Sequence, residues 1–238
     1  MLHKVTQWRG AAVTARDGDV GSIDDVYFDD ERLTVRYLVV DTGGWLNHRR
    51  VLISPYAVRT DVSADEQVFV DLTRAQVENS PPIEADEPVS RLYEKAYADY
   101  YRYPYYWAGP FTWGPGAYPA LTAGTLPDAL PAANDPPAID DEVTQQVLEA
   151  ARRSHLRSSR ELIGYHAEAR DGSAGRINDL VIDDVDWSVQ QIVVDTRKWL
   201  PGGQVTVPAD AVSDIDWAAS EVRLNMDRRS IKQAPAAH

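Results

Sequence analysis

ARDGDVGSIDDVYFDD, residues 15–30, returns with substitutions as ARDGSAGRINDLVIDD at residues 169–184. The same offset of 154 residues aligns VRYLVVDTGGWL (35–46) with VQQIVVDTRKWL (189–200) and needs no gap. Roughly two in five positions from 15 to 58 are identical to their counterparts. A repeat far longer than a solenoid unit predicts two homologous domains rather than a stack of short repeats.

Each copy has the pattern of a series of short strands. In the first copy we expect strands over 9–15, 20–28 and 34–41, and near 50–54 and 67–72. Asp17-Gly18 is a hairpin signal, and Gly18 and its counterpart Gly172 are predicted to adopt positive φ. Five or six short strands at about ten-residue spacing are typical of a small barrel or sandwich.

The strand VRYLVV is apolar on both faces at Leu38, Val39 and Val40, and the second copy repeats this at 192–194. A strand with one wet face would alternate, so this strand is predicted to be central and covered on both sides. Each copy then closes with a short helical turn, for which Thr73 and Asp227 are suitable N-caps.

The chain is therefore predicted to be mainly β, with two small barrels or sandwiches related by duplication and joined by an aromatic-rich, partly helical linker. The expected divisions are a first β domain over 1–82, a linker over 83–139, a helix over 140–158 and a second β domain over 159–238. Because each barrel is small, we expect the two to pack on each other, with approximate two-fold symmetry, or in a homodimer.

These motifs resemble the PRC-barrel domain. The resemblance rests on ARDGDVGSIDDVYFDD, YLVVDT, the Trp-Leu pairs at 45–46 and 199–200, and VLISP, and it covers roughly 9–81 and 160–235. The whole chain is similar to bacterial proteins with tandem PRC-barrels. The resemblance implies a barrel of about six strands, shared with the cytoplasmic part of the photosynthetic reaction-centre H subunit and with a ribosome-maturation factor. It implies a role in protein contact and brings no catalytic residues with it.

Positions kept between the copies are interpreted as structural: Gly18, Gly21, Asp25, Asp41, Trp45, Gly172, Gly175, Asp179, Asp195 and Trp199. The four aspartates are expected to accept hydrogen bonds from turn amides or to pair with Arg16 and Arg170. The two tryptophans are interpreted as plugs closing one barrel end, with a contact between the barrels as the alternative.

Bulk composition excludes several classes of protein. A net charge of −13 and a pI near 4.7 argue against a general nucleic-acid binder, which would gather Lys and Arg against phosphate. The chain has no cysteine, so disulfides and thiol chemistry are excluded. No apolar stretch approaches a membrane span, and we expect a soluble cytoplasmic protein with no direct membrane insertion.

Between 93 and 118 lie eight of the twelve tyrosines. A helix is predicted over about 87–101, with Leu92, Ala96 and Tyr100 on one stripe, ending before Pro104. Three roles are open for this segment: wrapping the first barrel and completing its core, forming a recognition surface, or stacking bases, which its few cations disfavour. The residues chosen for a recognition surface are Tyr100, Tyr101, Tyr105, Tyr106, Trp107 and Trp113.

Candidate chemistry is sparse. The acidic clusters around Asp24–Asp30 and Asp179–Asp186 could suggest calcium, but their spacing does not follow an EF-hand, and solvated hairpin ends are favoured. The five histidines show no metal-ligand spacing. His48, Arg49 and Arg50 form either a docking point for an acidic partner or protection of an edge strand. We assign no catalytic, cofactor-binding or metal-binding residue.

The sequence favours a non-catalytic protein-interaction or adaptor module whose partner it does not identify. The alternative is an accessory subunit of a photosynthetic or redox membrane complex, by analogy with the H subunit. A ribosome-assembly or RNA-processing factor is a third candidate, disfavoured by the acidic charge. An enzyme ranks last, because no nucleophile or oxyanion donor accompanies the paired carboxylates.

Overall fold

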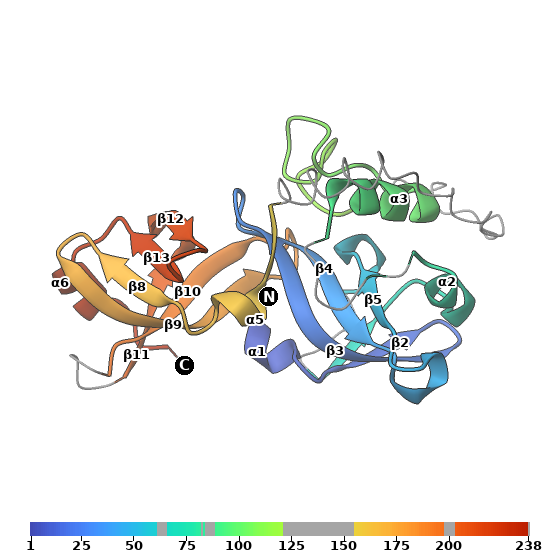
Figure 1. Ribbon diagram of the computed structural model, residues 1–238, viewed down its shortest axis with the longest axis horizontal. Helices are drawn as coiled ribbons and strands as arrows, with labels where there is room; N and C mark the ends of the chain where they lie inside the picture. The colour runs from blue at the N-terminus through green and yellow to red at the C-terminus, as the bar shows by residue number, and fades with distance from the viewer. Residues whose placement is uncertain (61–65, 82, 84–88, 121–154, 198–202, 238) are drawn as a thin grey trace.

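The computed structural model describes residues 1–60, 66–81, 83, 89–120, 155–197 and 203–237, and shows two β-sheet units side by side (Figure 1). The N-terminal unit has the strand order β5-β4-β3-β2-β6. Its strands are β2 (Ala12–Ala15), β3 (Gly18–Asp29), β4 (Thr34–Asp41), β5 (Arg50–Ile53) and β6 (Gln67–Phe69). Short helical elements follow its strands: η1 (Gly43–Leu46), η2 (Pro55–Ala57) and α2 (Arg74–Glu78).

The C-terminal unit repeats this arrangement in the order β11-β10-β9-β8-β13-β12. Its strands are β8 (His166–Ala169), β9 (Gly172–Asp183), β10 (Val189–Asp195), β11 (Gln204–Pro208), β12 (Val212–Asp216) and β13 (Glu221–Leu224), with η3 (Ala209–Ala211) and α6 (Arg228–Lys232). In both units one pair is parallel, β2 with β6 and β8 with β13, and the other ladders are antiparallel. The prediction of a mainly β chain is confirmed, and its strands form two sheets.

Strand β4 is the centre of its unit. It pairs with β3 on one side and β5 on the other, and every residue from Thr34 to Val40 is buried. The continuous apolar run of this strand predicted that result, because side chains on both faces are covered. In β10 the corresponding residues 192–194 are also buried, whereas Gln190 faces solvent.

Two glycine pairs shape the hairpins. Gly18 and Gly172 have φ of +141° and +127°, as predicted for these turns. Gly21 is more constrained, because a Cβ placed there would lie 2.0 Å from the carbonyl oxygen of Asp41. Its counterpart Gly175 would meet the Asp195 carbonyl at the same 2.0 Å. Only glycine allows β3 and β9 to approach the end of the neighbouring strand this closely.

The two units exchange their first strands. Strand β1 (Leu2–Lys4), with α1 (Val5–Trp8) after it, pairs with β9 of the C-terminal unit. Strand β7 (Leu156–Ser158), with α5 (Ser159–Leu162) after it, pairs with β3 of the N-terminal unit. We call β1–α1 and β7–α5 the two exchanged arms.

This exchange corrects the predicted boundaries. The first strand of residues 1–82 extends the sheet of the other unit, and the C-terminal repeat begins before 159. Residues 156–158 were predicted to end a helix over 140–158 but form β7; residues 140–154 of that helix lie outside the described residues. The physical reason is that β2 pairs only with the first part of β3, from Gly18 to Ser22, so the far end of β3 offers an open edge to β7.

The contacts between the units obey a two-fold symmetry. The Val35 amide donates to the Trp187 carbonyl at 2.8 Å, and the Val189 amide donates to the Leu33 carbonyl at 2.7 Å. Each bond becomes the other when its residues are replaced by their counterparts 154 residues away in the sequence. An isolated β-bridge between the two bonds joins Thr34 to its own counterpart, Ser188. The units are therefore related by a pseudo-dyad that passes between the β3–β4 and β9–β10 turns, as expected for a duplication that imitates a dimer.

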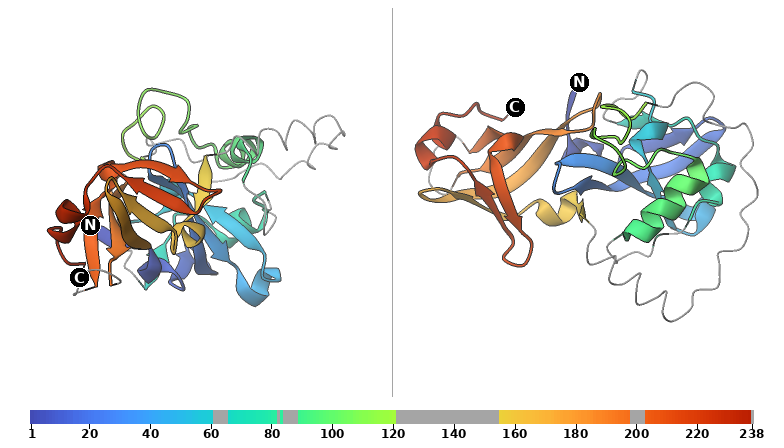
Figure 2. Two further views of the ribbon diagram at one scale, coloured as in Figure 1. Left: turned by 60° about the vertical axis from the view of Figure 1, so that its left-hand side comes forward. Right: turned by 90° about the horizontal axis from the view of Figure 1, so that it is seen from above.

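The core is continuous across this boundary. A single cluster of buried apolar side chains extends through both units. Trp8 of one arm packs against Trp187 of the C-terminal unit, with ring centroids 5.1 Å apart. Helix α3 (Arg91–Tyr101), the helical part of the predicted linker, lies over the N-terminal unit, as Figures 1 and 2 show from three directions.

Candidate functional site

Asp25 and Asp179, which occupy matching positions in the two repeats, hold the exchanged arms. Asp25 accepts hydrogen bonds from the hydroxyls of Ser158 and Ser159 and from the Arg160 amide. Asp179 accepts from the amide and hydroxyl of Thr6. Each carboxylate thus caps the first turn of the arm donated by the other repeat, where unpaired amide groups need an acceptor.

Of the two kinds of partner expected for these aspartates, backbone amides are the ones found, while Arg16 and Arg170 bond other residues. The Arg16 Nε donates to Asp71 Oδ1 at 2.6 Å, and the Arg170 Nε donates to Asn225 Oδ1 at 2.9 Å. Asp41 and Asp195 do accept from turn amides as predicted, from Gly43 at 2.8 Å and Arg197 at 3.0 Å.

The acidic clusters are not solvated hairpin ends, because several of their carboxylates are buried between the units. Asp25, Asp29, Asp179 and Asp184 are all less than a tenth exposed. Asp30 pairs with Arg157 of the exchanged arm at 3.1 Å, and Asp184 lies 3.0 Å from His3 of the other arm. Among the described residues no group of three or more His, Cys, Asp or Glu side chains could hold a metal ion.

Trp45 lies within its own unit. Its indole donates to the Val20 carbonyl at 2.5 Å, and the Arg74 guanidinium lies 4.3 Å from its ring centroid. These contacts agree with a plug at one end of the N-terminal unit and do not extend to the other unit. Trp199, its counterpart, lies outside the described residues.

His48, Arg49 and Arg50 each contact an acceptor within the chain. His48 lies 3.3 Å from Asp41, Arg49 donates to the Glu78 carbonyl, and Arg50 pairs with Asp24 at 3.1 Å. Strand β5, which Arg50 begins, is at the edge of its sheet. The arrangement favours edge protection over a docking point for an acidic partner.

Helix α3 begins after Ser90, whose hydroxyl accepts from the Tyr93 amide at 3.1 Å, and ends at Arg102 in the left-handed conformation. The predicted stripe is wrong at Ala96, which is exposed, and Tyr100 is half-buried, while the side chain of Leu92 lies outside what the structure describes. The buried positions are instead Glu94, Tyr97, Ala98 and Tyr101. The hydroxyl groups of Tyr97 and Tyr101 bond backbone groups of the N-terminal unit, so these rings are buried with their polar ends paired.

The tyrosines of α3 complete the core of the N-terminal unit. Tyr97 contacts Tyr37 edge-on at 5.2 Å between centroids, and its hydroxyl accepts from the Ser54 amide at 3.0 Å. Tyr103, just beyond the helix, stacks on Tyr56 at 5.2 Å. Of the three roles considered for this segment, core completion is what these contacts show.

Three residues chosen for a recognition surface are therefore unsuitable. Tyr101, Tyr106 and Trp113 are exposed by only 1%, 6% and 1%. The Tyr101 hydroxyl bonds the Gln76 carbonyl of α2, and the Trp113 indole donates to the Asp186 carbonyl of the C-terminal unit at 2.8 Å. Their rings tie the segment to both units instead of facing a partner.

Beneath this segment lies a buried charged cluster that sequence reasoning missed. Arg36, inside the apolar strand β4, pairs with Asp29 at 3.1 Å and donates to the Thr112 carbonyl at 2.8 Å. Its guanidinium lies 3.9 Å from the centroid of the Tyr106 ring and 4.9 Å from that of Trp113. Burial lowers the pKa of Arg36, against the opposing effect of Asp29. The sequence did hold a signal for this cluster, because an arginine inside the apolar run VRYLVV is buried only if other side chains or carbonyl groups pair with it.

Glu94 is a further charged residue near Arg36 and is fully buried. Its Oε1 accepts from the Tyr106 hydroxyl at 2.6 Å and lies 3.4 Å from the Tyr37 hydroxyl, while Oε2 lies 3.0 Å from Arg91 Nη1. Burial raises the pKa of Glu94 to about 7, and the nearby Arg91 and Tyr106 only partly oppose it. The Glu94 carboxyl therefore changes charge near neutral pH in the buried contact between α3 and the N-terminal unit.

Other aromatic side chains of the segment are at least partly exposed. Tyr105 and Trp107, here called the outer aromatic pair, are half-buried and stack at 5.0 Å with 10° between their planes. Arg91 lies 4.5 Å from the Trp107 ring and Lys95 lies 5.8 Å from the Tyr105 ring. Phe111 is 51% exposed. Tyr100 is half-buried, and its hydroxyl donates to the Gln76 carbonyl at 2.9 Å.

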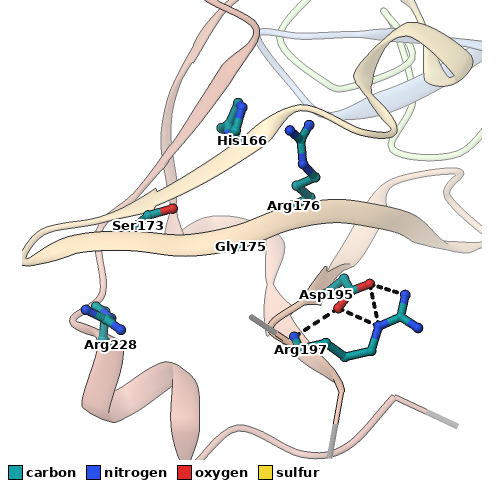
Figure 3. Close-up of a pocket in the computed structure, with 7 residues that line it drawn as sticks. All are labelled: His166, Ser173, Gly175, Arg176, Asp195, Arg197 and Arg228. Carbon is teal, nitrogen blue, oxygen red and sulfur yellow. Dashed lines mark hydrogen bonds and ion pairs between the residues drawn. The ribbon is translucent and has the colours of Figure 1, made fainter. Parts of the chain in front are cut away.

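A pocket opens in the C-terminal unit where β8, β9 and β10 lie side by side (Figure 3). Its volume is about 490 Å³, and its walls are His166, Ser173, Gly175, Arg176, Asp195, Arg197 and Arg228. Arg197 holds Asp195 through Nε at 2.9 Å and Nη2 at 2.5 Å. This pairing keeps the pKa of Asp195 below its ordinary value.

Comparison with known proteins identifies the first repeat. Residues 2–77 match the family model of the PRC-barrel domain. The match runs from β1 through β6 into α2, so a PRC-barrel domain forms the N-terminal part of the chain, and its first strand pairs with the other unit. No helix among the described residues is long and apolar enough to cross a membrane.

One similar protein comes from Deinococcus radiodurans and bears the name "Uncharacterized protein". It is 35% identical over 83 residues, which is 34% of this chain and 29% of that protein. The matching region thus spans less than a third of that relative's length, and the likeness concerns one domain.

Proposed function

We propose that this chain is a non-catalytic protein-interaction module in which the C-terminal unit is a second PRC-barrel. The five strands of the N-terminal order recur in the same order in the C-terminal unit, which adds β12, and this correspondence supports the tandem assignment together with the reciprocal arm exchange. The exchange joins the barrels into one body, because unpairing one arm opens a strand edge in the opposite unit. The surfaces of the two units then keep a fixed orientation to each other, as an adaptor that holds partner proteins in place requires.

The observation that carries the proposal is the outer aromatic pair. Buried tyrosines around it fasten the segment to the barrel, so Tyr105 and Trp107 are held in position before any partner arrives. Rigid aromatic rings contribute most to interfaces because little side-chain entropy is lost when they bind. Arg91 and Lys95 beside the rings already pair with Glu94 and Asp99, so the partner surface that fits the outer aromatic pair is apolar.

The test compares variants that differ only on the outside of the segment. The double variant Tyr105→Ser/Trp107→Ser should lose the partner that the wild-type chain captures from native extract. Ala108→Ser, an exposed neighbour, is the matched control and should retain it. Near-ultraviolet circular dichroism checks that the buried tyrosines are still packed. An unchanged partner set in the well-folded double variant would refute a role for the outer pair.

A further inference from the structure

Glu94 lies within the contact between α3 and the N-terminal unit, in the first turn of the helix, and is 0% exposed. Four charged or titratable side chains act on it: Arg91 from its own helix, Tyr106 from the chain beyond the helix, and Arg36 and Tyr37 from β4. Arginine keeps its charge in proteins, and burial raises the pKa of both tyrosines. Among these five described residues, Glu94 is therefore the one whose charge changes near neutral pH.

The neighbours of Glu94 compensate its negative charge only in part. Oε1 accepts from the Tyr106 hydroxyl at 2.6 Å, but no hydrogen bond from a described residue reaches Oε2. Arg91 Nη1 lies 3.0 Å from Oε2, yet it donates to the Tyr106 hydroxyl at 2.9 Å, and its side chain is 32% exposed, so water screens its charge. Arg36 pairs with Asp29 at 3.1 Å. Because a buried carboxylate with an unpaired oxygen is costly, the packed contact favours the neutral acid.

The partners of Glu94 also contact the outer aromatic pair. The Arg91 guanidinium lies 4.5 Å from the centroid of the Trp107 ring, and the Tyr106 ring meets Trp107 edge-on at 5.0 Å. Trp107 in turn stacks on Tyr105. A change in packing at Glu94 therefore reaches the outer aromatic pair through a single layer of side chains.

We propose that protonation of Glu94 holds α3 on β4 and thereby sets the position of the outer aromatic pair. The packed contact retains a proton that Glu94 releases at neutral pH once the contact opens and water reaches the carboxyl. Opening of α3 should therefore become more frequent as the pH rises. The consequence for partner binding rests on the proposed function: a partner that needs the packed segment should bind more tightly below neutral pH than above it.

The size of the effect follows from the two states of the carboxyl. The pKa of Glu94 is about 7 in the packed contact and is taken as the ordinary 4.5 in the opened one. Between about pH 6 and pH 8 the fraction of molecules with α3 opened should then increase about tenfold.

Thiol labelling of the full chain measures this opening, because the chain has no cysteine of its own. Ala98→Cys places a thiol at a buried position of α3, and Ala96→Cys places one at an exposed position of the same helix. The labelling rate of the first with dithiodipyridine, divided by that of the second, removes the pH dependence of the thiol itself. This ratio should rise about tenfold from about pH 6 to pH 8.

Glu94→Gln is the decisive variant, because glutamine has nearly the same shape and does not ionise. In the Glu94→Gln background the same ratio should change by less than about twofold. Hydrogen exchange of the α3 amides, compared between wild type and Glu94→Gln at each pH, is a second readout that needs no cysteine.

The contrary results are distinct. A labelling ratio in the Glu94 chain that does not change with pH refutes the proposal, and an equal rise in the Glu94→Gln background assigns the effect to another group. Equal capture of a partner at both pH values, with the rise in labelling present, separates the opening of α3 from partner binding. Labelling does not involve a partner, so its failure leaves the proposed interaction standing, and failure of the Tyr105→Ser/Trp107→Ser test leaves the protonation of Glu94 standing.

Discussion

Replacing Glu94 with glutamine tests the buried charged cluster most directly. In the folded chain the pKa of Glu94 is raised from 4.5 to about 7, with burial as the main cause. An acid with a higher pKa in the folded than in the unfolded state binds more protons when folded. Its contribution to stability is thus complete below pH 4.5 and disappears as the pH rises through 7. The shift corresponds to about 3 kcal/mol, and about 2–3 kcal/mol of it falls between pH 5 and pH 8.

Glutamine has nearly the same shape, can still accept from the Tyr106 hydroxyl, and does not ionise. The free energy of unfolding of Glu94→Gln relative to wild type should therefore rise by about 2–3 kcal/mol when the pH is changed from 5 to 8. Urea denaturation followed by tryptophan fluorescence at both pH values measures this difference, and titrations shared by both proteins cancel.

Glu78→Gln, on an exposed carboxyl of α2, is the control and should show no such change with pH. If wild type and Glu94→Gln respond to pH in parallel, the carboxyl is not desolvated in the folded chain, and the packing of α3 on β4 described above is incorrect.

Three further predictions concern the architecture. Gly21→Ala should destabilise the chain by about 3 kcal/mol in urea denaturation, because its Cβ would overlap a β4 carbonyl at positive φ, while Gly44→Ala, which meets nothing within 4 Å, should be nearly neutral. Asp25→Ala should abolish hydrogen-exchange protection in the β7–α5 arm and reduce stability by about 2–3 kcal/mol; retained protection would contradict its capping role. In the same assay Tyr101→Ser should lower the free energy of unfolding by about 3 kcal/mol, because the ring is buried, and Tyr105→Ser should lower it by less than about 1 kcal/mol. Equal losses would contradict the different burial of the two rings.

Much of the fold could be predicted from local patterns. Strand β4 is recognisable because its apolar residues do not alternate, and burial on both faces requires just that. Gly18 marks a turn that needs positive φ, and Thr73 is the expected N-cap of α2, where it also forms a capping box with Gln76. These features depend on residues close together in the chain, so the sequence displays them directly.

The candidate sites were less accessible to sequence reasoning. A run of tyrosines indicates either a core or a surface, since each ring is apolar and each hydroxyl is polar. The structure separates them by position, burying Tyr101 and Tyr106 and leaving Tyr105 and Trp107 half-exposed. The buried Glu94 had no sequence signal of its own, because a glutamate in a helix is normally solvated.

By itself, the sequence determined that the chain holds two homologous β units, because the repeat recurs without a gap and each unit's hairpins are local. It did not determine that the units exchange their first strands. That outcome depends on the open edges of β3 and β9, which only the assembled sheets create, and on Asp25 and Asp179, which accept amides more than 130 residues away. Tertiary structure decided these pairings because unpaired backbone groups at a sheet edge accept any strand that the rest of the fold brings within reach.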